Sequence, residues 1–279
     1  TKIPVSTPTL EKTITVKLPA IKGKRLHSKL SPSGKYIAFL SAIYEDSTHP
    51  DISQLNIISL ETFAIQTLIS SSAQYYASPV WSPDEKFIYF HSGDTSLLNT
   101  PPYSDVPGFS LLKISCDGKT KKTLLPPGKY YTNFGNDPVV PSPDNKTIAL
   151  SGKYDSKASR GGLYLLNTDG TGLKFIKEMG KEATWDSTGT LLLFAADRNI
   201  WIYNKTEDKL TQLTFNASPS FNPTWSPDGQ YVLYTSMKPI PGIEDRCEGI
   251  YLYNINTKEE SIISSDFSVI DIKSIHWIK

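Results

Sequence analysis

The sequence lacks several features by which classes of protein are recognised. Acidic and basic side chains nearly cancel, with 28 acids, 29 bases and a formal net charge of +1, and they are interspersed along the chain. Nothing therefore marks a surface for nucleic acid or for an anionic membrane. No apolar run approaches the length that a bilayer requires. We expect no nucleic-acid partner and no membrane insertion.

Cysteine and histidine are scarce as well. The two cysteines, Cys116 and Cys247, form neither a disulfide framework nor a metal motif, and two unpaired thiols suit either redox compartment. With only four histidines, there is no His-Glu-x-x-His motif, no Gly-x-Ser-x-Gly elbow and no glycine-rich phosphate loop. We therefore expect no cofactor and no catalytic metal. A protein without catalytic activity is favoured over an enzyme.

What the chain does contain is one short unit in several copies. The clearest copy runs from Trp225 through Ser226-Pro227-Asp228-Gly229 into residues 231–235. Serine, proline, aspartate and glycine in this order favour a type I turn closed by a residue that tolerates a positive φ. The β-branched and aromatic run that follows favours a strand. The unit predicts a strand, a tight turn and a second strand.

The copies recur at the interval of a propeller blade. The positions equivalent to Trp225 are Leu30, Trp81, Pro141, Trp185, Trp225 and Trp277, separated by 51, 60, 44, 40 and 52 residues. A four-stranded blade takes about 40 to 50 residues. The sequence therefore predicts an all-β protein, a β-propeller of four-stranded antiparallel blades, and six blades are favoured over five with a partial insert.

These repeats resemble those of the TolB family. The Trp-Ser-Pro-Asp-Gly turn, the apolar strand after it and a third strand at 249–255 are similar to the six-bladed TolB propeller. The resemblance covers residues 12–279 and implies that a protein or peptide segment binds. Similar repeats occur in propellers attached to dipeptidyl-peptidase-type hydrolases and in some polysaccharide lyases, so they specify fold more strongly than function. Neither the α/β domain of TolB nor a hydrolase domain is recognisable in these residues.

The two ends of the sequence are expected to close the ring. Residues 1–11 carry two prolines among threonines and predict an extended tether. Residues 12–18 alternate polar and apolar side chains like a half-buried strand, and we expect them to share the last blade with residues 269–277. The propeller would then span residues 12–279. We expect the protein to be a monomer. We expect a periplasmic or extracellular location, while the cytoplasm stays open.

Connections of unequal length are expected on one face of the propeller. The insertions are 42–51, 92–108, 152–161 and 236–249 between second and third strands, with 70–78 and 126–137 between blades. Long loops on one face of a rigid scaffold are where binding usually resides. From these loops we take Tyr75, Tyr76, Tyr130, Tyr131 and Arg246 as candidate ligand-binding residues. About half of the loop aromatics are expected only to pack their own loops down.

A polar set is expected at the channel mouth on the same face. The residues three positions before each tryptophan-equivalent position are His27, Ser78, Pro138, Glu182, Asn222 and Ser274. Of these, we take His27, Glu182 and Asn222 as candidate ligand-binding residues. A polar ring also lines any water-filled channel, so the set alone does not prove a site.

Two functions remain open from the sequence. In the first, a protein or peptide segment docks on the loop-rich face without catalysis. In the second, a carbohydrate-binding or carbohydrate-active propeller stacks sugars on its aromatics and uses Glu182 as acid or base. Such an enzyme needs two carboxylates, or a carboxylate and a metal, in one pocket, and only Asp137 is a candidate neighbour of Glu182. A three-histidine metal site would need His27, His276 and a histidine from a loop. We favour the first function.

Overall fold

The computed structural model describes residues 24–43, 52–94, 109–126, 139–152, 161–215, 217–238 and 249–264. The regular elements within them are all β-strands. They are β1 (Lys24–Leu30), β2 (Tyr36–Ile43), β3 (Ile52–Ser59), β4 (Ile65–Ser71), β5 (Gln74–Trp81), β6 (Phe87–Asp94), β7 (Phe109–Ser115), β8 (Lys121–Leu125), β9 (Val140–Pro141), β10 (Thr147–Gly152), β11 (Gly162–Asn167), β12 (Lys174–Glu178), β13 (Lys181–Trp185), β14 (Leu191–Ala196), β15 (Asn199–Asn204), β16 (Lys209–Gln212), β17 (Ser220–Trp225), β18 (Tyr231–Ser236), β19 (Gly249–Asn254) and β20 (Glu260–Ser264). No described segment forms a helix that could cross a membrane.

Within the described residues, the strands form five four-stranded sheets, each made of four consecutive strands paired antiparallel. We number these sheets blade one (β1–β4) to blade five (β17–β20). The all-β, four-stranded antiparallel architecture predicted from the repeats is confirmed. Residues 12–18 and 269–277, on which the predicted sixth blade depends, lie outside the described residues, so the number of blades stays a prediction.

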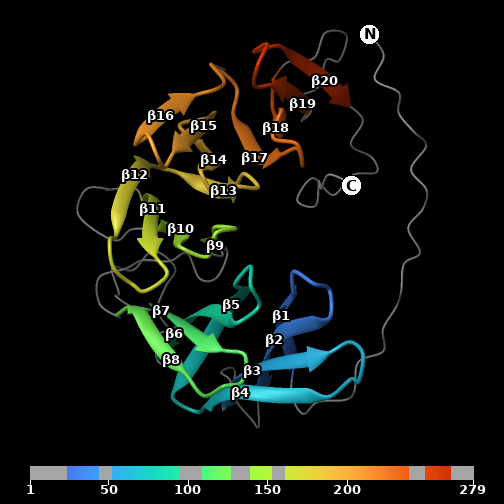
Figure 1. The fold of residues 1–279 in the computed structure, drawn as a ribbon, viewed down its shortest axis with the longest axis vertical. Helices are drawn as coiled ribbons and strands as arrows, with labels where there is room; N and C mark the ends of the chain where they lie inside the picture. Colours follow the sequence, from blue (N-terminus) through green and yellow to red (C-terminus); the bar gives the residue numbers. More distant parts are fainter. Residues whose placement is uncertain are drawn as a thin grey trace.

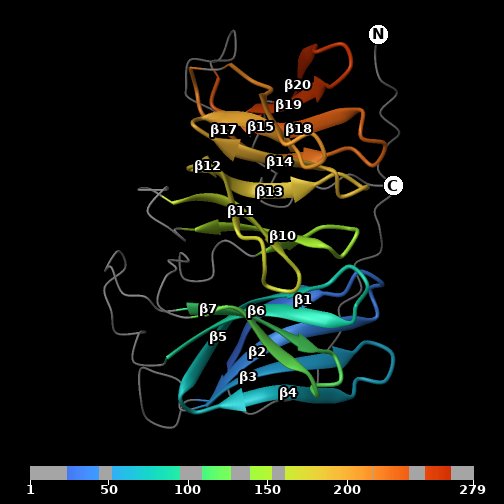
Figure 2. The ribbon, with the colours of Figure 1, turned by 60° about the vertical axis from the view of Figure 1, so that its left-hand side comes forward.

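The blades follow one another along an arc (Figure 1). In each blade the first strand lies nearest the centre and the fourth strand lies at the periphery. Turned by 60°, the same sheets form successive layers that face one another (Figure 2). The first strands β1, β5, β9, β13 and β17 therefore surround a common axis.

The Ser-Pro-Asp-Gly turn holds its shape through the side chains that the sequence pattern names. The Gly229 N–H donates to the Ser226 carbonyl oxygen at 2.9 Å, and φ of Gly229 is +70°. The Ser226 hydroxyl donates to the Asp228 carboxylate at 2.5 Å and accepts the Tyr231 N–H at 2.9 Å. The predicted turn is confirmed, and it leads from the first strand of the blade into the second.

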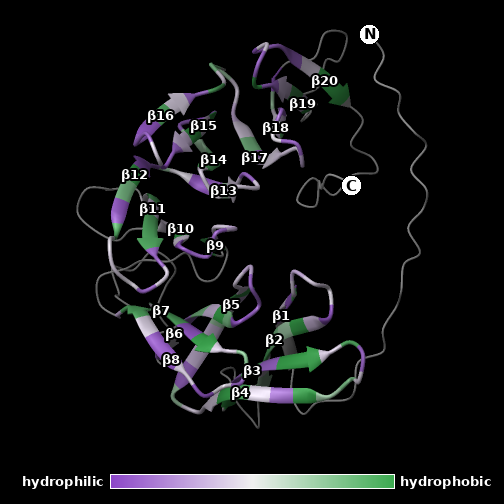
Figure 3. Cartoon of the chain, viewed as in Figure 1, coloured by the Kyte–Doolittle hydropathy of each residue, from purple (hydrophilic) through white to green (hydrophobic). Residues whose placement is uncertain are grey.

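The hydrophobic core lies between blades and not in a single centre. Each pair of consecutive blades shares one cluster of buried apolar side chains, and in Figure 3 hydrophobic colouring is concentrated in the strands. Between blades one and two, Leu40, Leu55 and Phe90 are almost fully buried. Burying one such side chain stabilises the fold by about 1.5–3 kcal/mol. Continuous burial of strands such as β6 and β14, which face a neighbouring blade on each side, thus fixes the stacking of blades.

Tryptophans at the ends of the first strands clamp neighbouring blades together. The Trp81 indole N–H donates to the Lys29 carbonyl oxygen of blade one at 2.9 Å. In the same way, the Trp185 indole donates to the Val140 carbonyl of blade three at 2.9 Å. Trp225 is equally buried, but its indole nitrogen has no hydrogen-bond partner among the described residues. Within them, the seam between blades four and five lacks this bond.

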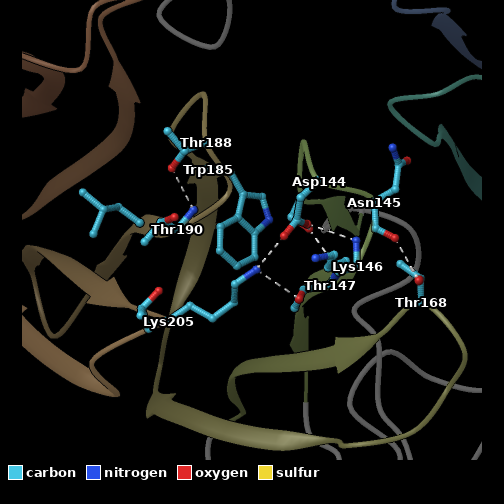
Figure 4. A network of polar contacts seen from close by, with 12 residues as sticks. Asp144, Asn145, Lys146, Thr147, Thr168, Trp185, Thr188, Thr190 and Lys205 are labelled. Atoms are coloured by element: carbon cyan, nitrogen blue, oxygen red, sulfur yellow. Dashed lines mark hydrogen bonds and ion pairs between the residues drawn. The ribbon is translucent and has the colours of Figure 1, made fainter.

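The face that carries the Ser-Pro-Asp-Gly turns is closed by its own side chains, as Figure 4 shows between blades three and four. Lys205 of blade four reaches across the seam to Asp144, with 3.1 Å between Nζ and Oδ2. Its ammonium also lies 3.4 Å from the Thr147 hydroxyl and 5.2 Å from the centre of the Trp185 ring. At this seam, the ammonium of Lys205 and the carboxylate of Asp144 are thus engaged within the protein.

Candidate functional site

Four of the first strands share a β-bulge at the same position of the repeat. The pairing with the second strand slips between Leu26 and Ser28, Ala77 and Val80, Lys181 and Thr184, and Phe221 and Thr224. A bulge leaves one residue out of the ladder and redirects its side chain. In these strands the bulge lies away from the Ser-Pro-Asp-Gly turn, toward the end where the chain enters from the preceding blade. The bulges therefore lie toward the face opposite the turn face.

The residue at each bulge has a left-handed backbone. The φ angles are +31° at His27, +50° at Ser78, +55° at Glu182 and +48° at Asn222. Non-glycine residues seldom adopt this region, and each costs about 1–3 kcal/mol that the surrounding structure must offset. These four are the described members of the polar set expected three positions before the tryptophan-equivalent positions. As predicted, the four residues occupy the same position of the repeat on their inner strands. That they bind a ligand stays a prediction.

Glu182 and Asn222 are brought together across the seam between blades four and five. The Asn222 backbone N–H donates to Oε2 of Glu182 at 2.7 Å. The other carboxylate oxygen, Oε1, lies 3.2 Å from Nζ of Lys181, and that ammonium lies 5.8 Å from the centre of the Phe221 ring. Both oxygens of the carboxylate are thus engaged by donors, and one side chain links two bulges.

His27 lies apart from this pair. It stands on β1 of blade one with its side chain exposed, and no hydrogen bond or ion pair of the described residues joins it to Glu182 or Asn222. The described residues also contain no group of three or more histidine, cysteine, aspartate or glutamate side chains able to hold a metal ion. His27, Glu182 and Asn222 therefore share a repeat position around the axis, while only the last two are in contact.

The predicted loop at 70–78 is wrong. Strand β4 continues to Ser71 and β5 begins at Gln74, so only two residues separate them and Tyr75 and Tyr76 lie on an inner strand. The serine run was expected to form a loop, but Ser71 pairs with Ser53 of β3 and extends the ladder. Both tyrosines therefore have strand neighbours and do not project from a loop.

Tyr76 is a residue of the core. Its side chain is 2% exposed, its ring packs edge-on against Phe90 with 5.5 Å between centroids, and burial raises the pKa of its phenol. Tyr75 is half-buried on the same strand. Tyr130, Tyr131 and Arg246 lie outside the described residues, as does Cys247. Cys116 has a free thiol.

Two side chains beside the bulges were not among the candidate ligand-binding residues taken from the sequence. Lys181 and Phe221 directly precede Glu182 and Asn222, and they complete the contacts of the Glu182 carboxylate described above. A search for every residue that flanks the repeated polar position would have found them. The left-handed backbone itself has no consistent sequence signal here, because Asn and His are enriched in that region but Ser and Glu are not.

Comparisons with known proteins place the fold. Neither a family model nor a curated protein sequence matches the chain. Among solved structures, TolB from Acinetobacter baumannii matches with a TM-score of 0.50 and 18% identity, over 87% of this chain and 53% of that one. An oligogalacturonate lyase in complex with manganese matches with a TM-score of 0.60 and 14% identity, over 88% of this chain and 66% of the lyase.

A third match is dipeptidyl peptidase 4 from Porphyromonas gingivalis, with a TM-score of 0.62 and 13% identity, over 89% of this chain and 40% of the peptidase. The chain thus spans about half the length of the TolB structure and less than half of the peptidase. At such identities the matches show a shared fold and no shared activity.

Proposed function

We propose that this TolB-like β-propeller is a non-enzymatic recognition module that binds a protein or peptide segment on the face opposite the Ser-Pro-Asp-Gly turns. Of the candidate residues, His27, Glu182 and Asn222 would contact the polar part of that segment near the axis. Tyr75, Tyr130, Tyr131 and Arg246 would contribute around them. Tyr76 is left out because it is buried in the core.

One observation carries this proposal. Four first strands hold a left-handed residue at one repeat position, and the four side chains are all different: His27, Ser78, Glu182 and Asn222. The backbone geometry is therefore a property of the fold, whereas the side chain at this position differs from blade to blade. Ser78 is buried, and solvent reaches His27, Glu182 and Asn222. Strained positions of this kind gather at binding and switch regions. A rigid ring with unequal polar groups is suited to recognising an asymmetric ligand.

The Glu182 contacts favour recognition over acid or base catalysis. Both carboxylate oxygens already accept donors from Asn222 and Lys181. A glycosidase would require a second carboxylate at a defined distance from the first. Asp137, its one candidate neighbour from the sequence, lies outside the described residues.

The proposal extends to the surroundings of the protein. A near-neutral chain of interspersed charges supports a partner other than nucleic acid. The fold resemblance to TolB supports a protein partner, a monomeric propeller and a periplasmic or extracellular location. Residues 12–279 would act as one propeller domain, with residues 1–11 as a tether.

Photo-crosslinking from two phenylalanine positions tests the proposal. Benzoylphenylalanine at position 221, beside Glu182, is compared with the same group at position 63, an exposed phenylalanine of the β3–β4 turn on the turn face. In an extract of the source organism, we expect position 221 to crosslink one protein and position 63 none. The crosslink should weaken when Glu182→Ala is added.

Two results would contradict the proposal. One is a crosslink of equal yield from position 63. The other is Glu182-dependent binding on a glycan array with no protein crosslinked from position 221, which would support the carbohydrate alternative.

A further inference from the structure

Three exposed side chains lie on the loop-bearing face along the seam between blades four and five. Arg198 stands in the two-residue turn between β14 and β15, Phe215 follows β16, and Met237 follows β18. Phe215 is 80% exposed, more than any other large hydrophobic side chain of the described residues, and Met237 is 41% exposed. We name these three residues the seam patch.

Hydrogen bonds hold the three connections of the seam patch together. The Arg198 guanidinium donates to the Ala217 carbonyl oxygen at 3.4 Å, which fixes it against the segment that follows Phe215. The Met237 N–H donates to the Pro219 carbonyl at 3.0 Å. The seam patch is therefore one local surface, although its residues come from three different connections.

Within the described residues, the seam patch has an unbalanced positive charge. The neighbouring Asp197 is already in an ion pair with Lys177, and no acidic side chain of the described residues pairs with Arg198. A guanidinium left in this way is a ready partner for a carboxylate, which it can bind with two parallel hydrogen bonds. Aromatic, methionine and arginine side chains are also the types enriched in the centre of protein interfaces.

The seam patch adjoins the candidate site at the axis. The Ser220 N–H at the start of β17 donates to the Arg198 carbonyl at 2.9 Å, and Asn222 follows two residues later on the same strand. Two residues of a strand cover about 7 Å. A short extended segment can therefore reach from the Glu182–Asn222 pair to Arg198.

We propose that the seam patch docks an acidic amphipathic segment of the partner protein, placing an apolar anchor against Phe215 and Met237 and a carboxylate on Arg198. This inference rests on the proposed function and adds the chemical class of the partner. Methionine can adapt its shape to several anchors, so the apolar contact is permissive, whereas the arginine selects for negative charge.

Peptide binding to the full chain tests the inference. A library of 12-residue peptides is synthesised in three matched sets: an apolar anchor with flanking Asp or Glu, the same peptides with Lys in place of the acids, and the acidic peptides with Ala in place of the anchor. We expect only the first set to bind in a fluorescence polarisation assay. Phe215→Ala should weaken the best binder about tenfold, and Arg198→Glu should do the same while favouring the lysine set.

Matched controls lie on the turn face. Phe63→Ala removes an exposed phenylalanine and Lys258→Glu reverses an exposed charge there, and both should leave binding unchanged. The inference is overturned if no set binds, if the acidic set binds no better than the lysine set, or if the seam variants bind like the wild type. In the last case, a loss of binding in Glu182→Ala would leave the proposed function standing.

Discussion

Individual side chains define the turns of this propeller through a small number of donors and acceptors. In blade four, Asp186 stands where the other turns have serine and Thr188 stands where blades two, three and five have aspartate. Both hydrogen bonds persist: Asp186 accepts the Leu191 N–H at 2.8 Å, as serine does elsewhere, and it accepts the Thr188 hydroxyl at 2.5 Å, with donor and acceptor exchanged. This turn was recognisable from the sequence because both residues supply the groups that the turn requires.

Gly229 allows a direct test of that turn chemistry. Its φ is +70°, and a Cβ placed there would meet no atom within 4 Å. Gly229→Ala should therefore lower the free energy of unfolding by about 1–2 kcal/mol through backbone strain alone. Urea unfolding measures this change. Gly34, with φ of +72° and equally open space, is the matched position, and no loss at either position would contradict the assignment.

His91 is a buried side chain whose cost depends on pH. It is 2% exposed on β6, and in the part of the chain that the structure describes neither ring nitrogen has a hydrogen-bond partner. Burial lowers its pKa from 6.5 to about 4. The unfolded chain takes up the proton near pH 6.5, whereas the folded chain takes it up only near pH 4. The free energy of unfolding that comes from keeping His91 neutral is therefore fully present above pH 6.5. It falls by roughly 3 kcal/mol at most as the pH falls toward 4.

His91→Leu should remove that part of the pH dependence. We expect the free energy of unfolding of the variant minus that of the wild type to rise as the pH falls from 6.5 to 4, because only the wild type loses stability there; urea titration at several pH values measures it. Parallel profiles over this range would show that His91 is protonated in the folded state. The sequence offered no hint of this residue, because one histidine in a strand gives no sign of whether it finds a partner.

The inner strands were the most predictable elements of the fold, and their bulges were the least. Strands β5, β13 and β17 each end on the tryptophan that marks the repeat, because an apolar strand followed by a tight turn is a local signal. The bulges depend on pairing with the second strand and on the next blade, so no local pattern reveals them. Tyr75 and Tyr76 were misplaced for the same reason, since the ladder of β3 and β4 decides where β4 ends.

The tryptophan clamps provide a comparison between seams. Trp81→Phe removes the indole bond to the Lys29 carbonyl and should cost about 1 kcal/mol more than Trp225→Phe, because the Trp225 indole has no partner to lose. Thermal or urea unfolding of the two variants gives the difference. Equal losses would mean that ring packing alone determines the contribution of these residues.

The stacking of the blades depends on contacts between segments far apart in sequence. In two seams the tryptophan indole bonds the carbonyl of the residue before the preceding tryptophan-equivalent position, namely Lys29 and Val140. The seam between blades four and five does not follow this rule within the described residues, since the Trp225 indole has no partner there. Residues 12–18 and 269–277 lie outside the described residues, and we propose that they form the closing blade.

Deleting either of these closing segments tests that proposal. A propeller left open loses one whole seam, so we expect the melting temperature of the entire domain to fall by roughly 10 °C or more, in a single transition. Trp277→Phe should have a smaller effect in the same direction. An unchanged melting temperature after deletion of residues 269–277 would show that the ring does not close in this way.

Recognition on the loop-bearing face is tested most directly by hydrogen–deuterium exchange of the protein with and without the partner identified by crosslinking. We predict slower exchange on binding in residues 178–185 and 215–224, which contain Glu182, Phe215 and Asn222, and no change in the turn residues 82–86 and 226–230. Protection confined to those turns, with none around Glu182 and Asn222, would contradict the proposed binding face.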